Sequence, residues 1–325
     1  MQHGFKRLLV AVRDIEGLSS TTLRKVAVLA RGSKATVELF HATTEPELVE
    51  TVWRDRSGRP ADVLFQTIES KTNARLARIG RSGPLAHIRV TVHSNWDNPT
   101  YEAIIRRALA IEADLVVIEA PRYGPELQPF LRHTDWQLIL HCPCPVLLIR
   151  SPGRYDRSQV LVAVDPLHAA DESADLDRRL LSAGKSLSRI LRGDVHACHV
   201  YLPISASTTS KSARRKRSPT DVESQPSESV QRAFERLVSR SRISPDHRHL
   251  VKGRISSGLA HVARKMHARI LVMGALSRSS EMRDSIGNIA EQVLEQVASD
   301  VLLIKPSEFK TKVQLKVALR PKFPG

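Results

Sequence analysis

The sequence predicts an α/β protein with two tandem doubly wound domains, each a five-stranded, mostly parallel sheet flanked by helices. Three observations predict this class. Short apolar runs alternate with amphipathic stretches along the whole chain, and the same order occurs twice. The later runs in each half also lack the period-two pattern of a strand with one wet face, as is typical of parallel strands that helices cover on both sides.

The duplication is visible in three pairs of matching segments. They are Lys6–Asp14 with Ser158–Pro166, Ala113–Ala120 with Ala268–Ala275, and Val146–Arg150 with Val301–Lys305. The first pair is offset by 152 residues and the other two by 155 residues. A period this long indicates two homologous domains and excludes a solenoid of short repeats. The polar turn-forming segment Ser151–Arg157 is the expected linker.

The elements of the two halves follow the same order. In the first half we expect strands at 6–12, 36–41, 88–92, 115–118 and 146–149, and helices at 21–31, 61–79, 100–111 and 134–141. In the second half we expect strands at 160–164, 195–200, 248–251, 270–273 and 301–304, and helices at 174–191, 228–242, 256–266 and 288–298. These patterns predict one domain over residues 1–152 and another over 158–310.

Two segments do not follow the βα alternation. Residues 203–227 are dominated by Ser, Thr, Pro and basic residues, and we expect a flexible insertion there. Residues 311–325 form a basic tail, in which Val313–Leu319 is interpreted either as an edge strand or as a loose end.

The formal net charge of +16 raises the question of a nucleic-acid partner. Five basic residues lie in Lys211–Arg217 and five more follow Glu308, and neither stretch contains an acidic residue. The excess charge therefore sits on the insertion and the tail, which weakens the case for a basic groove on a folded surface. Aromatic residues make up only 4% of the chain, which leaves few platforms for base stacking. Nucleic-acid contact through the basic insertion and tail is kept as an alternative.

No segment predicts a membrane span or a cleaved signal peptide. Apolar runs such as Leu8–Val12 and Val146–Ile149 are far shorter than the roughly 20 residues that a spanning helix needs. Three cysteines are too few for a disulfide framework and suit a reducing compartment. We expect a cytoplasmic protein.

The stretch Gly274–Asn288 has the pattern of a phosphate-binding loop. It follows the apolar run Ile270–Met273 and precedes an amphipathic helix, and a glycine lies near each end of the loop. Glycines allow close backbone approach, and the free N–H groups of the next helix favour an anion. Asn288 and Glu291 have the spacing of a capping box, which supports a helix start there. The alternative is a tight turn that binds nothing.

Taken together, these motifs resemble the universal stress protein family. Both domains open with an apolar run of the Leu-Val-Ala-Val type, and the second ends with a near-complete Gly-x2-Gly-x9-Gly-Ser/Thr loop and Val301–Pro306. In that loop Ser277 replaces the second glycine and Asn288 replaces the usual hydroxyl residue. Trp96–Ile105, Thr134–Ile139 and Cys142–Val146 resemble the tandem, E-type bacterial members.

The resemblance implies an adenine nucleotide, ATP with Mg2+, at the carboxyl ends of the second domain's strands, where ligands bind in such sheets. By position, Asp165 matches the acidic residue that contacts the nucleoside. Gly274, Ser277, Gly287 and Asn288 match the phosphate loop. Asp165 also has the alternative interpretation of a turn residue before Pro166. The implied role is a sensor in a stress response, or a very slow ATPase.

The first domain does not retain the loop. The 155-residue offset puts Glu119, Arg122, Arg132 and His133 at the positions of Gly274, Ser277, Gly287 and Asn288. Without glycines, and with a carboxylate that repels phosphate, this domain is predicted to be a structural or regulatory partner of the second. The fused pair can satisfy the family's dimer interface, so we expect a monomer or a weak homodimer.

Other chemistry has weak support in the sequence. His141, Cys142 and Cys144 invite a metal site, but the Cys-Pro-Cys spacing is not that of a zinc ligand pair. The common catalytic loops of kinases, hydrolases and metalloproteases are absent from the sequence. The functional alternative from another class is a module that binds a partner protein or a small apolar ligand.

Overall fold

The computed structural model describes residues 4–16, 18–43, 61–120, 133–168, 173–202, 228–275 and 288–315. The first half contains β1 (Arg7–Ala11), α1 (Ser20–Ser33), β2 (Thr36–Thr43), α3 (Ala61–Arg81), η1 (Gly83–Leu85), β3 (Val90–Trp96), α4 (Thr100–Ala110), β4 (Leu115–Glu119), α5 (His133–His141) and β5 (Val146–Ile149). The second half contains β6 (Val160–Ala163), η2 (Pro166–His168), α6 (Ser173–Leu191), β7 (Val195–Tyr201), α7 (Glu228–Arg240), η3 (Pro245–His247), β8 (Arg248–Lys252), α8 (Ile255–Lys265), β9 (Ile270–Gly274), α9 (Asn288–Gln296) and β10 (Asp300–Ile304).

The predicted α/β class is confirmed, and most elements begin and end within two residues of their predicted bounds. The third strand is the main difference, because it was predicted at 88–92 and spans Val90–Trp96. Its central residues His93, Ser94 and Asn95 are polar, yet they pair with β2. Since β3 is the outermost strand and several of its side chains are only partly buried, its sequence does not carry the apolar pattern of an inner strand.

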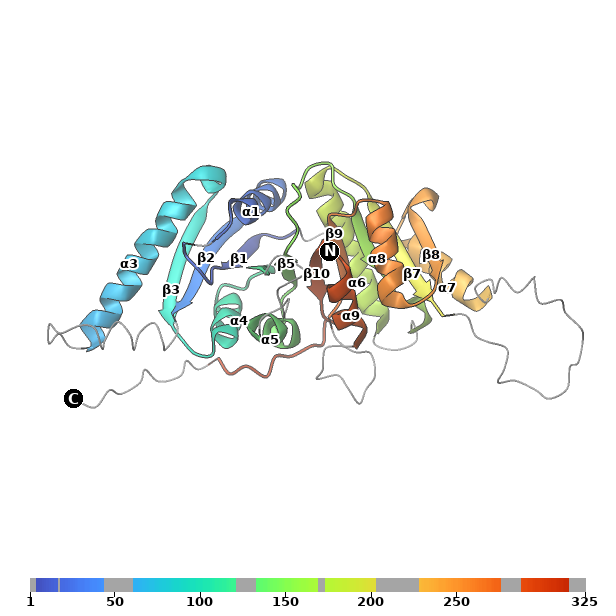
Figure 1. Cartoon of the computed structure of the whole chain (residues 1–325). Helices are drawn as coiled ribbons and strands as arrows, with labels where there is room; N and C mark the ends of the chain where they lie inside the picture. Colours follow the sequence, from blue (N-terminus) through green and yellow to red (C-terminus); the bar gives the residue numbers. More distant parts are fainter. Residues whose placement is uncertain are drawn as a thin grey trace, which may run out of the picture.

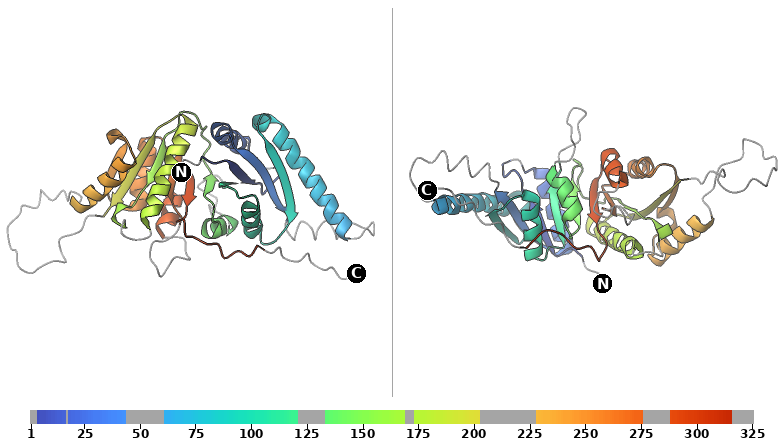
Figure 2. Two further views of the ribbon diagram at one scale, coloured as in Figure 1. Left: turned by 180° about the vertical axis from the view of Figure 1, so that it is seen from behind. Right: turned by 90° about the horizontal axis from the view of Figure 1, so that it is seen from below.

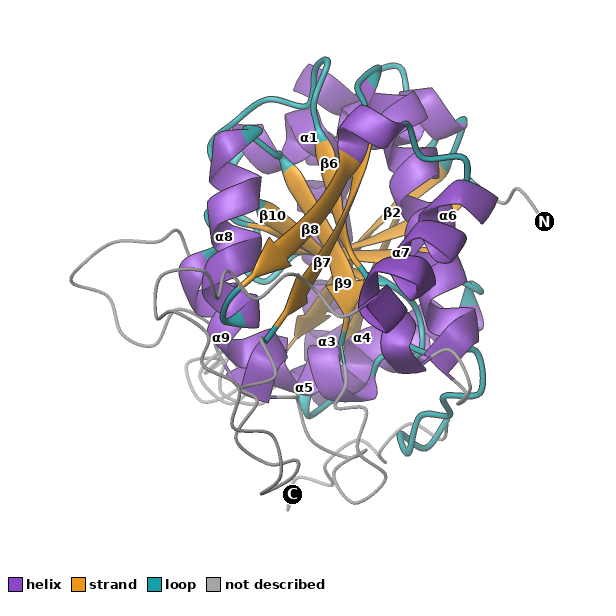
Figure 3. Cartoon of the chain, turned by 90° about the vertical axis from the view of Figure 1, so that its right-hand side faces the viewer, coloured by secondary structure: helices purple, strands orange, loops and turns teal. Residues whose placement is uncertain are grey.

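The ten strands of the described residues form one sheet, in the order β3-β2-β1-β4-β5-β10-β9-β6-β7-β8. Pairing is parallel within each half, and the halves join where β5 and β10 pair antiparallel, with Leu147 opposite Leu302. Figure 1 shows the two halves side by side about this seam, and Figure 3 shows helices on both faces of the twisted sheet. The two homologous halves therefore share a continuous backbone hydrogen-bond network.

The core is continuous across the seam as well. One apolar layer on each face of the sheet contains buried side chains from both halves. On one face α1 packs against α6, where Gly32 faces Ile190, and a Cβ added to Gly32 would lie 2.7 Å from Ile190 Cγ2. The absent side chain at Gly32 therefore allows the close approach of these two helices.

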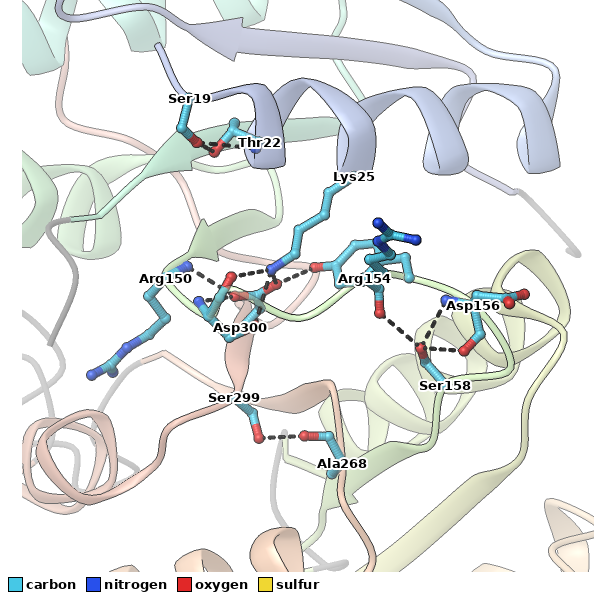
Figure 4. Close-up of polar contacts among 12 residues, drawn as sticks. Ser19, Thr22, Lys25, Arg150, Arg154, Asp156, Ser158, Ala268, Ser299 and Asp300 are labelled. Atoms are coloured by element: carbon cyan, nitrogen blue, oxygen red, sulfur yellow. Dashed lines mark hydrogen bonds and ion pairs between the residues drawn. The ribbon is translucent and has the colours of Figure 1, made fainter. Parts of the chain in front are cut away.

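A buried ionic network joins the halves at the start of β10. The Asp300 carboxylate is fully buried and accepts hydrogen bonds from the backbone N–H groups of Arg150 (2.8 Å) and Ser151 (2.7 Å) and from the Tyr155 hydroxyl (2.7 Å). Lys25, from α1 of the first half, reaches the same carboxylate with its Nζ at 2.5 Å (Figure 4). Burial, followed by the Asp300 charge, raises the pKa of Tyr155 well above its ordinary value, so its hydroxyl keeps the proton that it donates.

Two cations cross the seam in a reciprocal way. Arg150, after the last strand of the first half, donates to the carbonyl of Leu294 near the end of α9. Lys305, after the last strand of the second half, donates to the carbonyl of Cys142 just after α5 (2.5 Å). Each half therefore places a positive charge at the carboxyl end of the other half's last helix, where the helix dipole favours it. Burial lowers the pKa of Lys305 to about 8.

The chain after β10 crosses to the first half without forming a strand over residues 305–315. Arg106 of α4 donates to the Gln314 carbonyl (3.3 Å), and Val313 packs against the core. Figure 2 shows this segment running from β10 towards α4. The insertion at 203–227 and the tail from residue 316 lie outside the described residues. Among the helices of the described ranges, none is long and apolar enough to cross a membrane.

Candidate functional site

The carboxyl edge of the second half carries two of the predicted site residues, Asp165 and Gly274. β6 and β9 are neighbours in the sheet and run parallel, with Val162 opposite Val272. Asp165 follows β6 by two residues and Gly274 ends β9, so both lie at the same edge of the sheet. Asn288 begins α9, as predicted. Ser277 and Gly287 lie outside the described residues.

Asp165 is held at its backbone. Its N–H group donates to the two carboxylate oxygens of Asp177, at 3.2 and 3.3 Å, and Asp177 is buried in the first turns of α6. The Asp165 side chain itself is about one-third exposed (32%). The turn that carries Asp165 is therefore fixed by a buried carboxylate, while its own side chain remains partly exposed.

A histidine supports the same turn from β7. The Nδ1 atom of His199 lies 3.0 Å from the Val164 carbonyl, so this nitrogen carries the proton, and it lies 4.0 Å from Asp165 Oδ1. His41 makes the equivalent contact in the first half, with Nδ1 2.8 Å from the Val12 carbonyl. Because the contact occurs in both halves, we interpret it as structural: it holds the end of the first strand of each half against the second strand. The sequence contains the signal for this pair in the repeated histidine, whereas nothing in the sequence points to Asp177.

Gly274 has a packing reason as well as a possible ligand-binding one. A Cβ at this position would lie 3.2 Å from Leu176 Cδ2 of α6, which is closer than most real contacts. The next N–H group, of Ala275, donates to the Ile304 carbonyl at 3.1 Å. The first residue of the loop is therefore fixed by β10 and lies close to α6.

Three apolar side chains of the described residues are exposed in the segments that follow β6 and β7 and at the start of α9. Leu167 of η2 is 49% exposed, Leu202 after β7 is 66% exposed, and Ile289 in the first turn of α9 is 47% exposed. Each of them offers apolar surface to a flat ring or to a partner. The second half therefore has a partly exposed carboxylate, a helix start and exposed apolar side chains in the segments that follow its strands.

The corresponding edge of the first half is occupied by its own side chains. Arg13, at the position of Asp165, forms an ion pair with Asp135 of α5, and Asp135 is fully buried. Glu119, at the position of Gly274, accepts a hydrogen bond from the Ser19 N–H group (3.1 Å) at the start of α1. His133 begins α5, and Arg122 and Arg132 lie outside the described residues. Arg13 and Glu119 therefore both have partners within the first half.

The Cys-Pro-Cys segment does not form a metal centre in the described part of the chain. Within the described ranges, no group of three or more His, Cys, Asp or Glu side chains has a metal-binding arrangement. Cys142 is buried and Cys144 is partly exposed, and both are free thiols. A hydrogen bond from Cys142 lowers the pKa of Cys144, and the same bond, followed by burial, raises the pKa of Cys142.

The fold defines a duplicated α/β protein whose two halves carry different side chains at corresponding strand ends. The model of the universal stress protein family matches residues 4–150 and 157–305. The chain therefore belongs to the universal stress protein family, with two family domains in tandem.

Named relatives and solved structures agree with this assignment. The chain is 26% identical over 240 residues to Universal stress protein E of Salmonella typhi, covering 71% of this chain and 73% of that protein. It is also similar to a crystal structure of a universal stress protein from Pseudomonas aeruginosa UCBPP-PA14, with a TM-score of 0.71, 20% identity, and coverage of 94% and 95%. A universal stress protein structure from Archaeoglobus fulgidus has a TM-score of 0.63 at 15% identity, with coverage of 92% and 98%. At these identities the structures show a shared fold.

Proposed function

We propose that the second domain binds an adenine nucleotide, ATP with Mg2+, at the carboxyl edge of its sheet and acts as a sensor or regulator in a stress response. The observation that supports the proposal is that Asp165 and Gly274 follow neighbouring parallel strands, so both lie at one edge of the sheet, and that α9 begins at Asn288. A helix start favours phosphate, and a carboxylate at the other end accepts hydrogen bonds from hydroxyl or amino groups. The apolar side chains of Leu167, Leu202 and Ile289 supply surface for the base.

The first domain is proposed to support the second without binding nucleotide. Its edge carries Arg13 and Glu119, and each has a partner within the same half. A phosphate group at this edge would be repelled by the Glu119 carboxylate. To bind the Ser19 N–H group, the phosphate would have to displace Glu119 from its hydrogen bond. We propose that this domain contributes the seam with β10, and that any ATP hydrolysis by the chain is slow.

Calorimetry on the full chain tests the proposal. ATP with Mg2+ is titrated into the wild-type protein and into two matched variants that neutralise an edge carboxylate, Asp165→Asn in the second domain and Glu119→Gln in the first. We expect one nucleotide per chain, a tenfold or greater loss of affinity in Asp165→Asn, and unchanged affinity in Glu119→Gln. Absence of heat for the wild-type protein at high concentration would overturn the proposal.

A second candidate has support from the same apolar side chains. Leu167, Leu202 and Ile289 also suit a partner protein or a small apolar ligand. Native mass spectrometry of freshly purified protein separates the two functions, because a retained nucleotide mass favours the first and a retained non-nucleotide mass favours the second. Nucleic-acid contact through Lys211–Arg217 and the tail is tested by salt titration with and without those segments, and equal affinity would exclude it.

A further inference from the structure

Three histidines meet at the outer edge of the second domain, on the strand ends opposite the candidate nucleotide site. His196 is the second residue of β7, His249 is the second residue of β8, and His247 ends η3 immediately before β8. β7 and β8 pair in parallel with Cys198 opposite His249, so the register puts His196 opposite His247. Because side chains two residues apart share a face, all three rings lie on one side of the sheet.

The rings are in direct contact. His196 Nδ1 and His249 Nε2 are 3.0 Å apart, and the centroid of the His247 ring is 4.1 Å from that of His196. The other nitrogen of His196, Nε2, lies 3.3 Å from Gln159 Oε1, which only accepts hydrogen bonds. The proton of neutral His196 is therefore on Nε2, and its Nδ1 accepts the proton of His249 Nε2. These hydrogen bonds therefore require that the rings of His196 and His249 are both neutral.

A proton added to His196 would disrupt this arrangement. Its Nδ1 would then carry a hydrogen directed at the N–H of His249, and its positive charge would lie beside two further imidazoles. The charged groups that face the cluster are Asp194, which favours the proton on His196, and Lys265 of α8, which disfavours it on His249. His196 has two neighbouring histidines, which disfavour a positive charge on its ring, and one nearby carboxylate, Asp194, which favours it. Together with burial, the two histidines outweigh the carboxylate, so a positive charge on His196 is disfavoured.

We infer that these three histidines form an acid-sensitive latch that holds the outer strand β8 and η3 against β7 at neutral pH and releases them on acidification. β8 is the outermost strand of the ten-stranded sheet, with β7 as its neighbour, so its release leaves the remaining sheet intact. The inference is independent of nucleotide binding, because the cluster lies at the amino ends of β7 and β8.

The direction and size of the effect follow from the protonation of His196. Burial and the two neighbouring histidines lower its pKa from 6.5 to about 4. A released His196 titrates at the ordinary value, so acidification below pH 6.5 favours the released state until the pH approaches 4. At pH 5.5 this difference corresponds to an increase in the released population of up to about tenfold for one site. Because the ring is only half-buried, solvent screening reduces this figure.

Hydrogen exchange of the full chain tests the latch. Exchange of peptides covering 243–252 is compared at pH 7.5 and 5.5, with correction for intrinsic rates and with EDTA present to exclude bound metal. We expect protection of β8 in the wild-type protein to fall several-fold at pH 5.5 relative to β6. The variant His249→Gln keeps a donor towards His196 and removes one titrating ring, so a smaller fall is expected. The exposed His261 on α8 provides a control, and His261→Gln should behave as wild type.

The triple variant His196→Asn, His247→Gln, His249→Gln removes all three titrating groups and should show no pH-dependent loss of protection. If that variant does not fold, the comparison of wild type, His249→Gln and His261→Gln decides alone. Equal protection of β8 in the wild-type protein at both pH values would overturn the inference. An identical fall in wild type and His249→Gln would also overturn it, because the acid effect would then come from other groups.

Discussion

Replacing Lys25 by methionine removes the counter-charge of a fully buried carboxylate at the seam between the two halves. Lys25 and Asp300 have side-chain exposures of 1% and 0%, and their charged atoms are 2.5 Å apart. The variant leaves Asp300 with hydrogen bonds from Arg150, Ser151 and Tyr155 but without this cation. Breaking a buried pair on one side typically costs about 3–5 kcal/mol, because an uncompensated charge remains in a low-dielectric interior. We expect a loss in that range.

Urea unfolding followed by circular dichroism and by tryptophan fluorescence measures this loss. The matched control is Arg232→Met, which breaks the exposed pair with Glu228 (72% and 82% exposed) and should cost below about 0.5 kcal/mol. Asp300→Asn and the double variant complete a cycle, in which the double variant should be more stable than the sum of the single losses by about 1–3 kcal/mol. A loss below about 1 kcal/mol for Lys25→Met, or additive losses in the cycle, would refute the reasoning.

Three further predictions concern the same seam. Arg150→Met and Lys305→Met should each lower the free energy of unfolding by about 1–2 kcal/mol, since each removes a cation from a helix carboxyl end; thermal unfolding checks this, and unchanged Tm values would contradict it. Gly32→Ala should cost about 1–3 kcal/mol because its Cβ would meet Ile190 at 2.7 Å, whereas Gly4→Ala, with no atom within 4 Å, should be neutral in the same assay. Truncation after Glu308 should expose α4 to faster hydrogen exchange through loss of Val313 and the Gln314 carbonyl, while β1 keeps its protection; equal exchange at α4 would show that the segment adds nothing there.

The sequence was sufficient to predict the element order, the duplication and the α/β class. Short apolar runs, helix-period segments and turn formers are local signals, and each half repeats them at a nearly constant offset. The third strand was placed too early because its polar residues His93, Ser94 and Asn95 lie at the outer edge, where burial does not impose an apolar pattern. These three residues belong to a strand because they pair with β2, and such pairing between distant segments is not a local signal.

The candidate site was predictable in part. Asp165 and Gly274 could be placed at one sheet edge because they follow neighbouring parallel strands, and the predicted helix start at Asn288 is confirmed. The support of Asp165 by Asp177 was not predictable, because the two residues meet only when α6 folds back on β6. The internal pairing of Arg13 with Asp135 is a similar case, since it joins residues 122 positions apart.

The sequence by itself determined that there are two related α/β halves, and that only the second has glycines at the positions of the predicted phosphate loop. The tertiary structure decided how the halves combine: β5 and β10 pair antiparallel into one sheet, and Lys25 meets Asp300 beneath that seam. It also decided that His196, His247 and His249 touch. Local patterns specify which segments are strands and helices, whereas contacts between distant segments depend on the register and packing of the whole sheet.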